Sequence, residues 1–336
     1  MIKEIKENSI IAEIGSVHDG SFGNACKLVE LAKGCGADIV KFQTHIAESE
    51  TIKHAPMPNY FKGEPRYEYF KRTAFSKEQW VNLKKICDDL EIEFLSSPFS
   101  IEAAELLQEI GVKKFKIPSG EVTNIPLIEK LASYCKPVLI SSGMSNWEEL
   151  DKAVNILIDK VDLTIMQCTS KYPCPPQYVG LNIFSELRSR YGSEFKLGFS
   201  DHTSTISAGI AAAALGAKSI EKHLTFSKLM YGSDAKNSLE PDEFVCYSKS
   251  IKEVWFMLDN PILKNQIDDF QDIKRVFEKS IFASKELASG SEITFSDLSF
   301  KKPGDGLSAA FYKDLLGLSV KRDLPMGHKF SWEDFK

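Results

Sequence analysis

Two histidines stand at equivalent places in the sequence, because His202 and His223 each lie at the carboxyl end of a predicted strand. Two imidazoles on neighbouring strands can bind one transition metal, with a carboxylate and water completing the coordination. The alternative is that each histidine is an ordinary core or loop residue. The equivalent placement favours a metal site. His18 and His45 also lie near predicted strand ends.

Two lysines lie inside apolar stretches, Lys41 in IVKFQ and Lys116 in KFKIPSG. A buried ammonium is costly unless its charge is paired. If both lysines face one pocket, they form a positive site for a phosphate or carboxylate. Two alternatives stay open: a lysine could form a Schiff base with a carbonyl substrate, or it could point outward between helices with only its stem buried.

Polar residues gather at the carboxyl end of every predicted strand. They are Glu13, Lys41, Gln43, Ser96, Ser97, Lys116, Ser119, Glu121, Ser141, Ser142, Gln167, Thr169, Ser200, Asp201, His202, Glu221, Lys222 and His223. In a barrel of parallel strands these ends form one rim, where active sites lie. We therefore expect all of them at one rim, and we expect an enzyme. Asp234, which follows the last strand, is a candidate base or metal ligand.

A repeated strand–helix pattern accounts for this rim. The predicted strands are 9–15, 38–44, 93–98, 114–120, 137–143, 163–170, 196–202 and 219–225. Several are continuous apolar runs, as is typical of parallel strands buried on both faces. Amphipathic helical stretches lie between them and end at Gly, as in AAAALGAKSIEKH. The pattern predicts an α/β fold, a (β/α)8 TIM barrel over residues 1–260. An insert at about 45–72 lies where barrels carry active-site loops.

The remainder of the chain has a different character. Residues 261–278 are predicted to be a linker, and residues 279–336 combine short alternating strands with turn signals. This predicts a small, mostly β domain.

Composition excludes several classes of protein. The net charge is -5, from 42 basic and 47 acidic residues, which argues against nucleic acid as a partner. No apolar run is long enough for a membrane helix, and the first residues do not resemble a signal peptide. The 7 cysteines contain no CxxC pair, so we expect free thiols and a cytoplasmic location.

An ordered set of motifs runs along the chain: AEIGSVHDG, ADIVKFQT, FLSSPF, KIPSGEVTN, SSGMS, TSKYPCPP, GFSDHT, IEKHLT and GSDAKNSLEPDEF. In this order they resemble the motifs of the sialic acid (N-acetylneuraminate) synthase family, which includes legionaminic and pseudaminic acid synthases. The tail, with SIFASKELASGSEIT and KKPGDGLS, resembles that family's C-terminal antifreeze-like (SAF) domain. The resemblance covers nearly the whole chain.

The resemblance implies condensation of phosphoenolpyruvate with an open-chain N-acetylated amino sugar. That sugar would be N-acetylmannosamine or a di-N-acetylated 6-deoxyhexose, and the products a nine-carbon 2-keto acid and phosphate. It implies a divalent metal, Mn²⁺ or Mg²⁺, held by His202 and His223. It makes Glu13 and Asp234 catalytic carboxylates beside these histidines. It also implies a homodimer in which the C-terminal domain caps the partner's active site.

The substrate contacts are carried over from the same resemblance. The positions matching phosphoenolpyruvate contacts are Lys41, Ser97, Lys116, Ser119, Ser141, Asn182 and Ser200. The candidates for sugar contacts are Gln43, Glu121 and Tyr172. Lys302 matches an arginine that reaches a neighbouring subunit's active site, which keeps the charge but not the bidentate geometry. The sequence also departs from the usual family pattern at Ser97, where Thr is common, and at Ala235, where His is common.

Two other functions stay open from the sequence. One is a Schiff-base aldolase or lyase on the same barrel, which would use Lys41 or Lys116. The other is a non-catalytic carbohydrate- or ice-binding protein, which the antifreeze-like tail alone would suggest.

Overall fold

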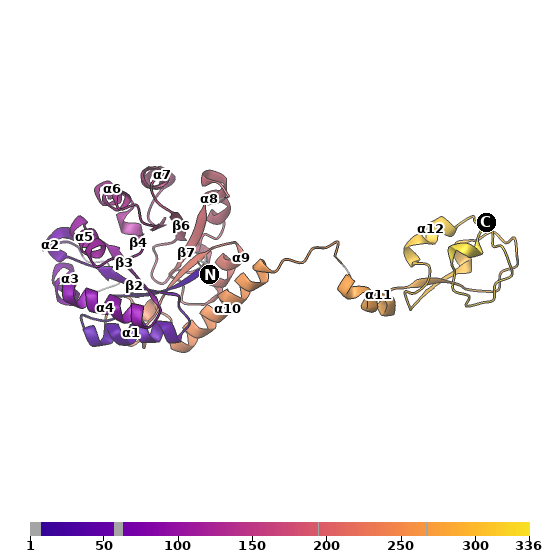
Figure 1. Cartoon of the computed structure of the whole chain (residues 1–336), viewed down its shortest axis with the longest axis horizontal. Helices are drawn as coiled ribbons and strands as arrows, with labels where there is room; N and C mark the ends of the chain where they lie inside the picture. Colours follow the sequence, from indigo (N-terminus) through magenta and orange to yellow (C-terminus); the bar gives the residue numbers. More distant parts are fainter. Residues whose placement is uncertain (1–7, 57–62, 194, 267) are drawn as a thin grey trace. The chain divides into compact units, whose positions relative to one another are not determined.

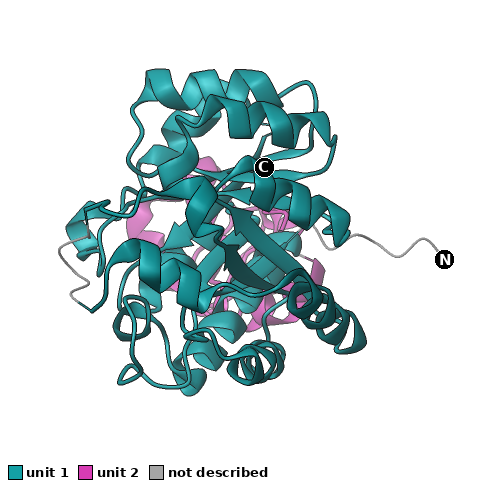
Figure 2. Ribbon diagram, turned by 90° about the vertical axis from the view of Figure 1, so that its left-hand side faces the viewer, with its two compact units in different colours: residues 1–260 teal, residues 261–336 magenta. Residues whose placement is uncertain are grey.

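The computed structural model describes residues 8–56, 63–193, 195–266 and 268–336. The chain divides into two compact units, residues 1–260 and 261–336, which are coloured separately in Figure 2. Each unit has its own buried apolar cluster.

The first unit is built on one 8-stranded parallel sheet with the order β3-β2-β1-β8-β7-β6-β5-β4. Its strands are β1 (Ser9–Gly15), β2 (Ile39–Thr44), β3 (Glu93–Pro98), β4 (Phe115–Ile117), β5 (Val138–Ser141), β6 (Leu163–Cys168), β7 (Lys196–Asp201) and β8 (Ser219–His223). Strand β3 also packs against β4, which closes the ring. The predicted (β/α)8 barrel is confirmed.

Helices surround these strands (Figure 1). They are α1 (Phe22–Gly34), α2 (Ala47–Glu50), α3 (Arg66–Thr73), α4 (Lys77–Asp89), α5 (Ile101–Glu109), α6 (Ile125–Ser133), α7 (Trp147–Leu157), α8 (Ile183–Tyr191), α9 (Ser207–Ala214) and α10 (Pro241–Asp259). Local sequence defines their starts: Ser76 caps α4 in a capping box with Gln79, and Ser100 caps α5.

The interior of the barrel carries a small apolar layer formed by Ile11, Ile39, Leu95, Leu139 and Met166. Side chains on a strand alternate between its two faces, so the residue two positions further along points inward as well. Those next residues are Glu13, Lys41, Ser97, Ser141 and Cys168. Strand periodicity therefore places a polar layer directly above an apolar floor.

Strand β4 is shorter than predicted. It ends at Ile117, and a 3-10 helix at Ser119–Glu121 follows Pro118. Proline has no N–H to donate to the sheet, so the ladder stops there. The turn brings Ser119 and Glu121 to the rim within three residues.

The second unit is small and mostly β, as predicted. Strands β9 (Ser280–Ala283) and β10 (Leu298–Lys301) pair antiparallel, and α12 (Tyr312–Leu315) is a short helix. The range predicted as a linker contains helix α11 (Gln271–Phe277). Its Arg275 carbonyl accepts a hydrogen bond from Gly304 N–H at 2.8 Å, so the helix is held by the second unit. Within the described part of the chain, no helix is long and apolar enough to cross a membrane.

Candidate active site

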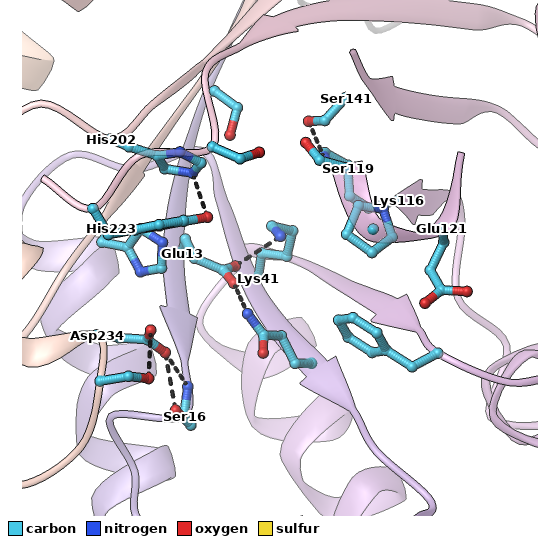
Figure 3. Close-up of a pocket in the computed structure, with 18 of the residues that line it drawn as sticks. Glu13, Ser16, Lys41, Lys116, Ser119, Glu121, Ser141, His202, His223 and Asp234 are labelled. Atoms are coloured by element: carbon cyan, nitrogen blue, oxygen red, sulfur yellow. Dashed lines mark hydrogen bonds and ion pairs between the residues drawn. The ribbon is translucent and has the colours of Figure 1, made fainter. Parts of the chain in front are cut away.

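A pocket of about 590 Å³ lies at the carboxyl ends of the barrel strands (Figure 3). Most of the predicted site residues line it. They are Glu13, Lys41, Gln43, Lys116, Ser119, Glu121, Ser141, Tyr172, Ser200, His202, His223 and Asp234. The barrel thus brings together side chains that are up to 221 positions apart in sequence, from Glu13 to Asp234.

Three predicted site residues do not line this pocket. Ser97 is fully buried beside it and accepts a hydrogen bond from Lys41 Nζ at 3.4 Å, so it supports the lysine. Asn182 precedes helix α8, and its side chain donates to Glu186 at 2.9 Å. Ser170, which comes from the loop after β6, lines the pocket although it was not among the predicted site residues. Lys302 belongs to the second unit, where its ammonium lies 4.6 Å from the centre of the Phe277 ring.

The expectation that every polar strand-end residue faces one rim is wrong for Asp201 and Lys222. Each lies next to an inward-facing residue, so strand alternation turns it away from the pocket. The two form a fully buried ion pair at 3.1 Å, and Tyr247 OH donates to Asp201 at 3.2 Å. The strand-end residues that likewise do not line the pocket are Ser96, Ser142, Gln167 and Thr169.

Two carboxylates and two lysines form the buried centre of the pocket. Lys41 Nζ lies 3.0 Å from Glu13 and 3.4 Å from Glu221. Lys116 Nζ lies 4.0 Å from Glu221 and donates to Ser141 Oγ at 2.6 Å. Ser200 Oγ also donates to Glu221, at 3.0 Å. Glu221 was given no role from the sequence, although its spacing of two from His223 places both on the inner face of β8.

The two carboxylates share Lys41, but Glu221 also lies near Lys116, and their pKa values differ. Burial raises the pKa of Glu13 to about 7, and the charge of Glu221 adds to the rise, whereas Lys41 opposes it. Burial also acts to raise the pKa of Glu221, but Lys116 and Lys41 together outweigh it and lower that pKa to about 2. Glu13 is therefore the carboxyl group suited to exchange a proton near neutral pH.

The two histidines face each other across part of the pocket, with ring centres 5.9 Å apart. His202 Nδ1 lies 2.9 Å from the Thr169 carbonyl, to which it can only donate, so the lone pair is on Nε2. That Nε2 lies 3.1 Å from Tyr172 OH. His223 is buried, and with the described residues its Nδ1 makes no hydrogen bond. Burial lowers the pKa of His223 to about 4, which keeps the ring neutral.

The two histidines could supply part of the coordination of a divalent transition metal. In their neutral forms the two imidazoles would supply two nitrogen ligands, and the orphaned Nδ1 of His223 is a buried polar atom in need of a partner. Over the described chain, no three His, Cys, Asp or Glu side chains converge to hold an ion by themselves. Water or substrate oxygens would have to complete the coordination.

Asp234 lies beside the histidines and is held by the turn after β1. Its Oδ2 accepts from Ser16 N–H at 3.0 Å and from Ser16 Oγ at 2.9 Å. Ser233 Oγ donates to the other carboxylate oxygen at 3.0 Å. A side chain at Gly15, where φ is +54°, would collide with the Asp234 carboxylate. A glycine at the end of β1 therefore lets the backbone approach this acid.

Comparison with known proteins agrees with this architecture. The NeuB family profile matches residues 28–262, and the SAF domain profile matches residues 278–336. The chain is 35% identical to N,N'-diacetyllegionaminic acid synthase of Campylobacter jejuni, over 93% of this chain and 96% of that protein. It is 33% identical to human N-acetylneuraminate-9-phosphate synthase, over 87% of this chain and 82% of that protein.

A solved structure gives the same result. N-acetylneuraminic acid (sialic acid) synthetase from Leptospira borgpetersenii superposes with a TM-score of 0.70 at 30% identity. The match covers 80% of this chain and 90% of that one. Fold and sequence agree, and the chain belongs to the NeuB family, with a SAF domain at its C-terminal end.

Proposed function

We propose that this protein is a nonulosonic acid synthase. It condenses phosphoenolpyruvate with the open-chain form of an N-acetylated amino sugar, and it releases phosphate and a nine-carbon 2-keto acid. One observation supports this best: a single pocket combines two buried lysines and several serine hydroxyls with a pair of facing histidines. Relatives named as synthases of sialic and legionaminic acids support the same proposal.

The lysine and serine side of the pocket would bind phosphoenolpyruvate. Lys41 and Lys116 supply positive charge, and Ser119, Ser141 and Ser200 supply hydroxyl groups that would turn to donate to the substrate. Glu221 holds both ammonium groups in place before the substrate arrives, at 3.4 and 4.0 Å. Preorganised cations of this kind stabilise charge that develops on a departing phosphate.

The histidine side would receive the sugar aldehyde. His202 and His223 would hold a divalent cation, Mn²⁺ or Mg²⁺. Such an ion supplies Lewis-acid polarisation of the aldehyde oxygen. Tyr172, which contacts His202, and Gln43, which donates to Glu13 at 2.8 Å, line the space where the sugar chain would follow.

The reaction then proceeds by carbon–carbon bond formation. C3 of phosphoenolpyruvate attacks the aldehyde carbon, and C2 takes up water. The resulting tetrahedral phosphate ester collapses to the ketone and expels phosphate. Glu13, with its pKa near 7, is placed to accept the proton of the attacking water, and Asp234 is fixed by Ser16 to orient it.

We also propose, from the family resemblance, that the protein acts as a homodimer. The second unit of one protomer would cover the pocket of its partner and bring Lys302 to the substrate. A monomeric enzyme with full activity would contradict this arrangement. Sedimentation at the protein concentration of the assay measures it.

The test of the function is coupled turnover. With Mn²⁺ present, the purified protein should release phosphate from phosphoenolpyruvate only when a suitable amino sugar is added. A chelator should stop the release, and Mn²⁺ should restore it. Release without sugar, or turnover that a chelator leaves unchanged, would contradict the proposal.

A Schiff-base aldolase is the second candidate, and one observation favours it: burial lowers the pKa of Lys116, which increases the fraction of its amine in the unprotonated, nucleophilic form. Borohydride in the presence of pyruvate would trap a covalent adduct on Lys116 or Lys41 in that case. The proposed synthase should give no adduct.

A further inference from the structure

One end of the pocket is walled by four planar groups stacked on one another. The His45 ring lies 3.9 Å from the Phe70 ring and 4.3 Å from the Phe99 ring, nearly parallel to both. The Arg66 guanidinium lies 5.2 Å from the centre of the Phe70 ring. All four residues line the pocket. Arg66 and Phe70 come from helix α3, at the end of the insert predicted to lie at the rim.

This stack is fixed from both sides. His45 Nδ1 lies 2.9 Å from the Glu50 carboxylate, and His45 Nε2 lies 3.1 Å from Gln43 Oε1. The other end of the Gln43 amide donates to Glu13. A continuous chain of contacts therefore runs from the catalytic carboxyl group to the aromatic stack. Such a wall is preorganised, because its side chains have few other conformations to adopt.

Two polar groups stand at this same end. Glu121 is half-buried, and one of its carboxylate oxygens accepts from Asn124 Nδ2 at 2.7 Å. Burial raises the pKa of Glu121 and Arg66 opposes the rise, so the two side chains are within electrostatic reach. With the described residues, the Arg66 guanidinium contacts the Phe70 ring and forms no ion pair. Figure 3 shows Glu121 across the pocket from His202, His223 and Asp234.

We propose that this end of the pocket is a subsite for an acetamido group on the far half of the acceptor sugar. Glu121 accepts a hydrogen bond from the amide N–H, and Arg66 donates to the amide carbonyl. The methyl group packs on the apolar wall formed by Phe70, Phe99, Pro118 and Met144. The inference rests on the proposed synthase function and narrows its substrate to a sugar with a second acetamido group, beyond the one beside the aldehyde.

The chemistry of the subsite separates this group from two others. A phosphate at the far end of the sugar would carry two negative charges next to the Glu121 carboxylate, which repels it. A hydroxyl could bond to Glu121 or Arg66 but would leave the apolar wall facing water. An acetamido group has one donor, one acceptor and one methyl group, and the subsite has one partner for each.

The experiment compares two sugars that differ only at this group. They are 2,4-diacetamido-2,4,6-trideoxymannose and 2-acetamido-2,6-dideoxymannose, each assayed with phosphoenolpyruvate and Mn²⁺ by phosphate release. We expect kcat/KM to favour the diacetamido sugar by at least about tenfold, since a site built to bond a polar group discriminates against a ligand that lacks it. Equal use of both sugars overturns the inference and leaves the synthase function standing. If neither sugar supports phosphate release, both the inference and the proposed synthase function are overturned.

Substitutions then locate the preference. Arg66→Met keeps the length of the side chain but removes its donors, and it should lower the ratio of the two kcat/KM values by about tenfold. Lys71→Met is the matched control, because Lys71 is an exposed cation on the same helix, and the ratio should not change. Glu121→Gln should lower the ratio as well. A ratio unaffected by both Arg66→Met and Glu121→Gln overturns the inference.

Discussion

Two sets of buried carboxyl groups differ in how they are paired, namely Asp334 in the second unit and the Glu13–Glu221 pair in the barrel. In the second unit, Asp334 is 1% exposed and accepts hydrogen bonds from Ser331 N–H, Arg322 and His328, each at 2.9 Å. In the barrel, Glu13 and Glu221 share Lys41, and His223 Nδ1 lacks a hydrogen-bond partner among the described residues. The fully hydrogen-bonded network around Asp334 stabilises a fold. The group around Glu13 and Glu221 has polar atoms without full partners, and it is suited to receive a ligand.

The pKa values express the same contrast. Burial acts to raise the pKa of Asp334, but the bonds from His328, Ser331 and Arg322 outweigh it and lower the pKa to about 2. Burial prevails at Glu13 and brings its pKa to about 7. We therefore expect changes in the barrel pocket to affect turnover, and changes at Asp334 to affect stability.

The largest expected effect is at the histidine pair. His202→Ala should reduce kcat by more than about 10⁴-fold while the thermal unfolding of the barrel stays cooperative, because a group that acts as part of a unit cannot be replaced by its neighbours. His54→Ala is the control, since His54 is exposed and outside the pocket. If the His202 variant kept a tenth of the activity, the histidine pair would not be part of the chemistry.

A smaller loss of activity is expected when the Glu13 carboxyl group is replaced. Glu13→Gln keeps the shape of the side chain and should reduce kcat by about 10²- to 10³-fold, as expected for a general base. It removes a negative charge beside Glu221, so the thermal midpoint should stay the same or rise. Kinetics and melting of the same preparation measure both. Glu148→Gln, at an exposed position on helix α7, should change neither. A marked fall in the thermal midpoint of the Glu13 variant would show that Glu13, like Asp334, serves stability, which would contradict the contrast between the two sites.

The second unit should respond in the reverse sense. Asp334→Asn should lower the free energy of unfolding of this unit by about 1–3 kcal/mol, because it weakens hydrogen bonds to a buried charge. Hydrogen exchange of amides in residues 279–336 would report the loss, and exchange in the barrel core should not change. Asp314→Asn, on the exposed surface of helix α12, is the control. Equal destabilisation by the two variants would remove the special role of Asp334.

The smallest predicted effect is a pH dependence of the same unit. A carboxyl group whose folded pKa is depressed stabilises the fold fully above its unfolded pKa, near 3.8, and loses that contribution as the pH falls to about 2. Stability of the second unit should therefore fall between about pH 4 and pH 2. The fluorescence of Trp332, measured with the barrel tryptophans replaced by phenylalanine, would follow this change. In Asp334→Asn the same decline should be shallower, and an equally steep decline would contradict the assignment.

Much of the fold could be predicted from the sequence because local signals agree with the tertiary structure. Glycines at helix ends, such as Gly216 with φ of +91°, mark short turns into buried strands. The barrel then determines which end of each strand carries the chemistry. This was enough to bring Glu13, Lys116 and His202 to one pocket.

Other features of the site could not be predicted from the position of a residue at a strand end. Asp201 and Lys222 turn away because side chains alternate, and only the register shows which of two neighbours points inward. Asn182 follows a 3-10 helix at Pro176–Tyr178, directly before α8, and does not line the pocket. The aromatic stack around His45 depends on helix α3 folding back over the rim, and no local pattern encodes that contact.

We expect this pocket to break the carbon–oxygen bond of phosphoenolpyruvate after joining it to a sugar. Phosphoenolpyruvate labelled with ¹⁸O in the bridge between C2 and phosphorus tests this directly. Water adds to C2 and the phosphate leaves with the bridging oxygen, so mass spectrometry should find the label in the released phosphate and one oxygen from water in the new ketone. Phosphate without the label would mean that water attacks phosphorus, and it would rule out cleavage of the carbon–oxygen bond.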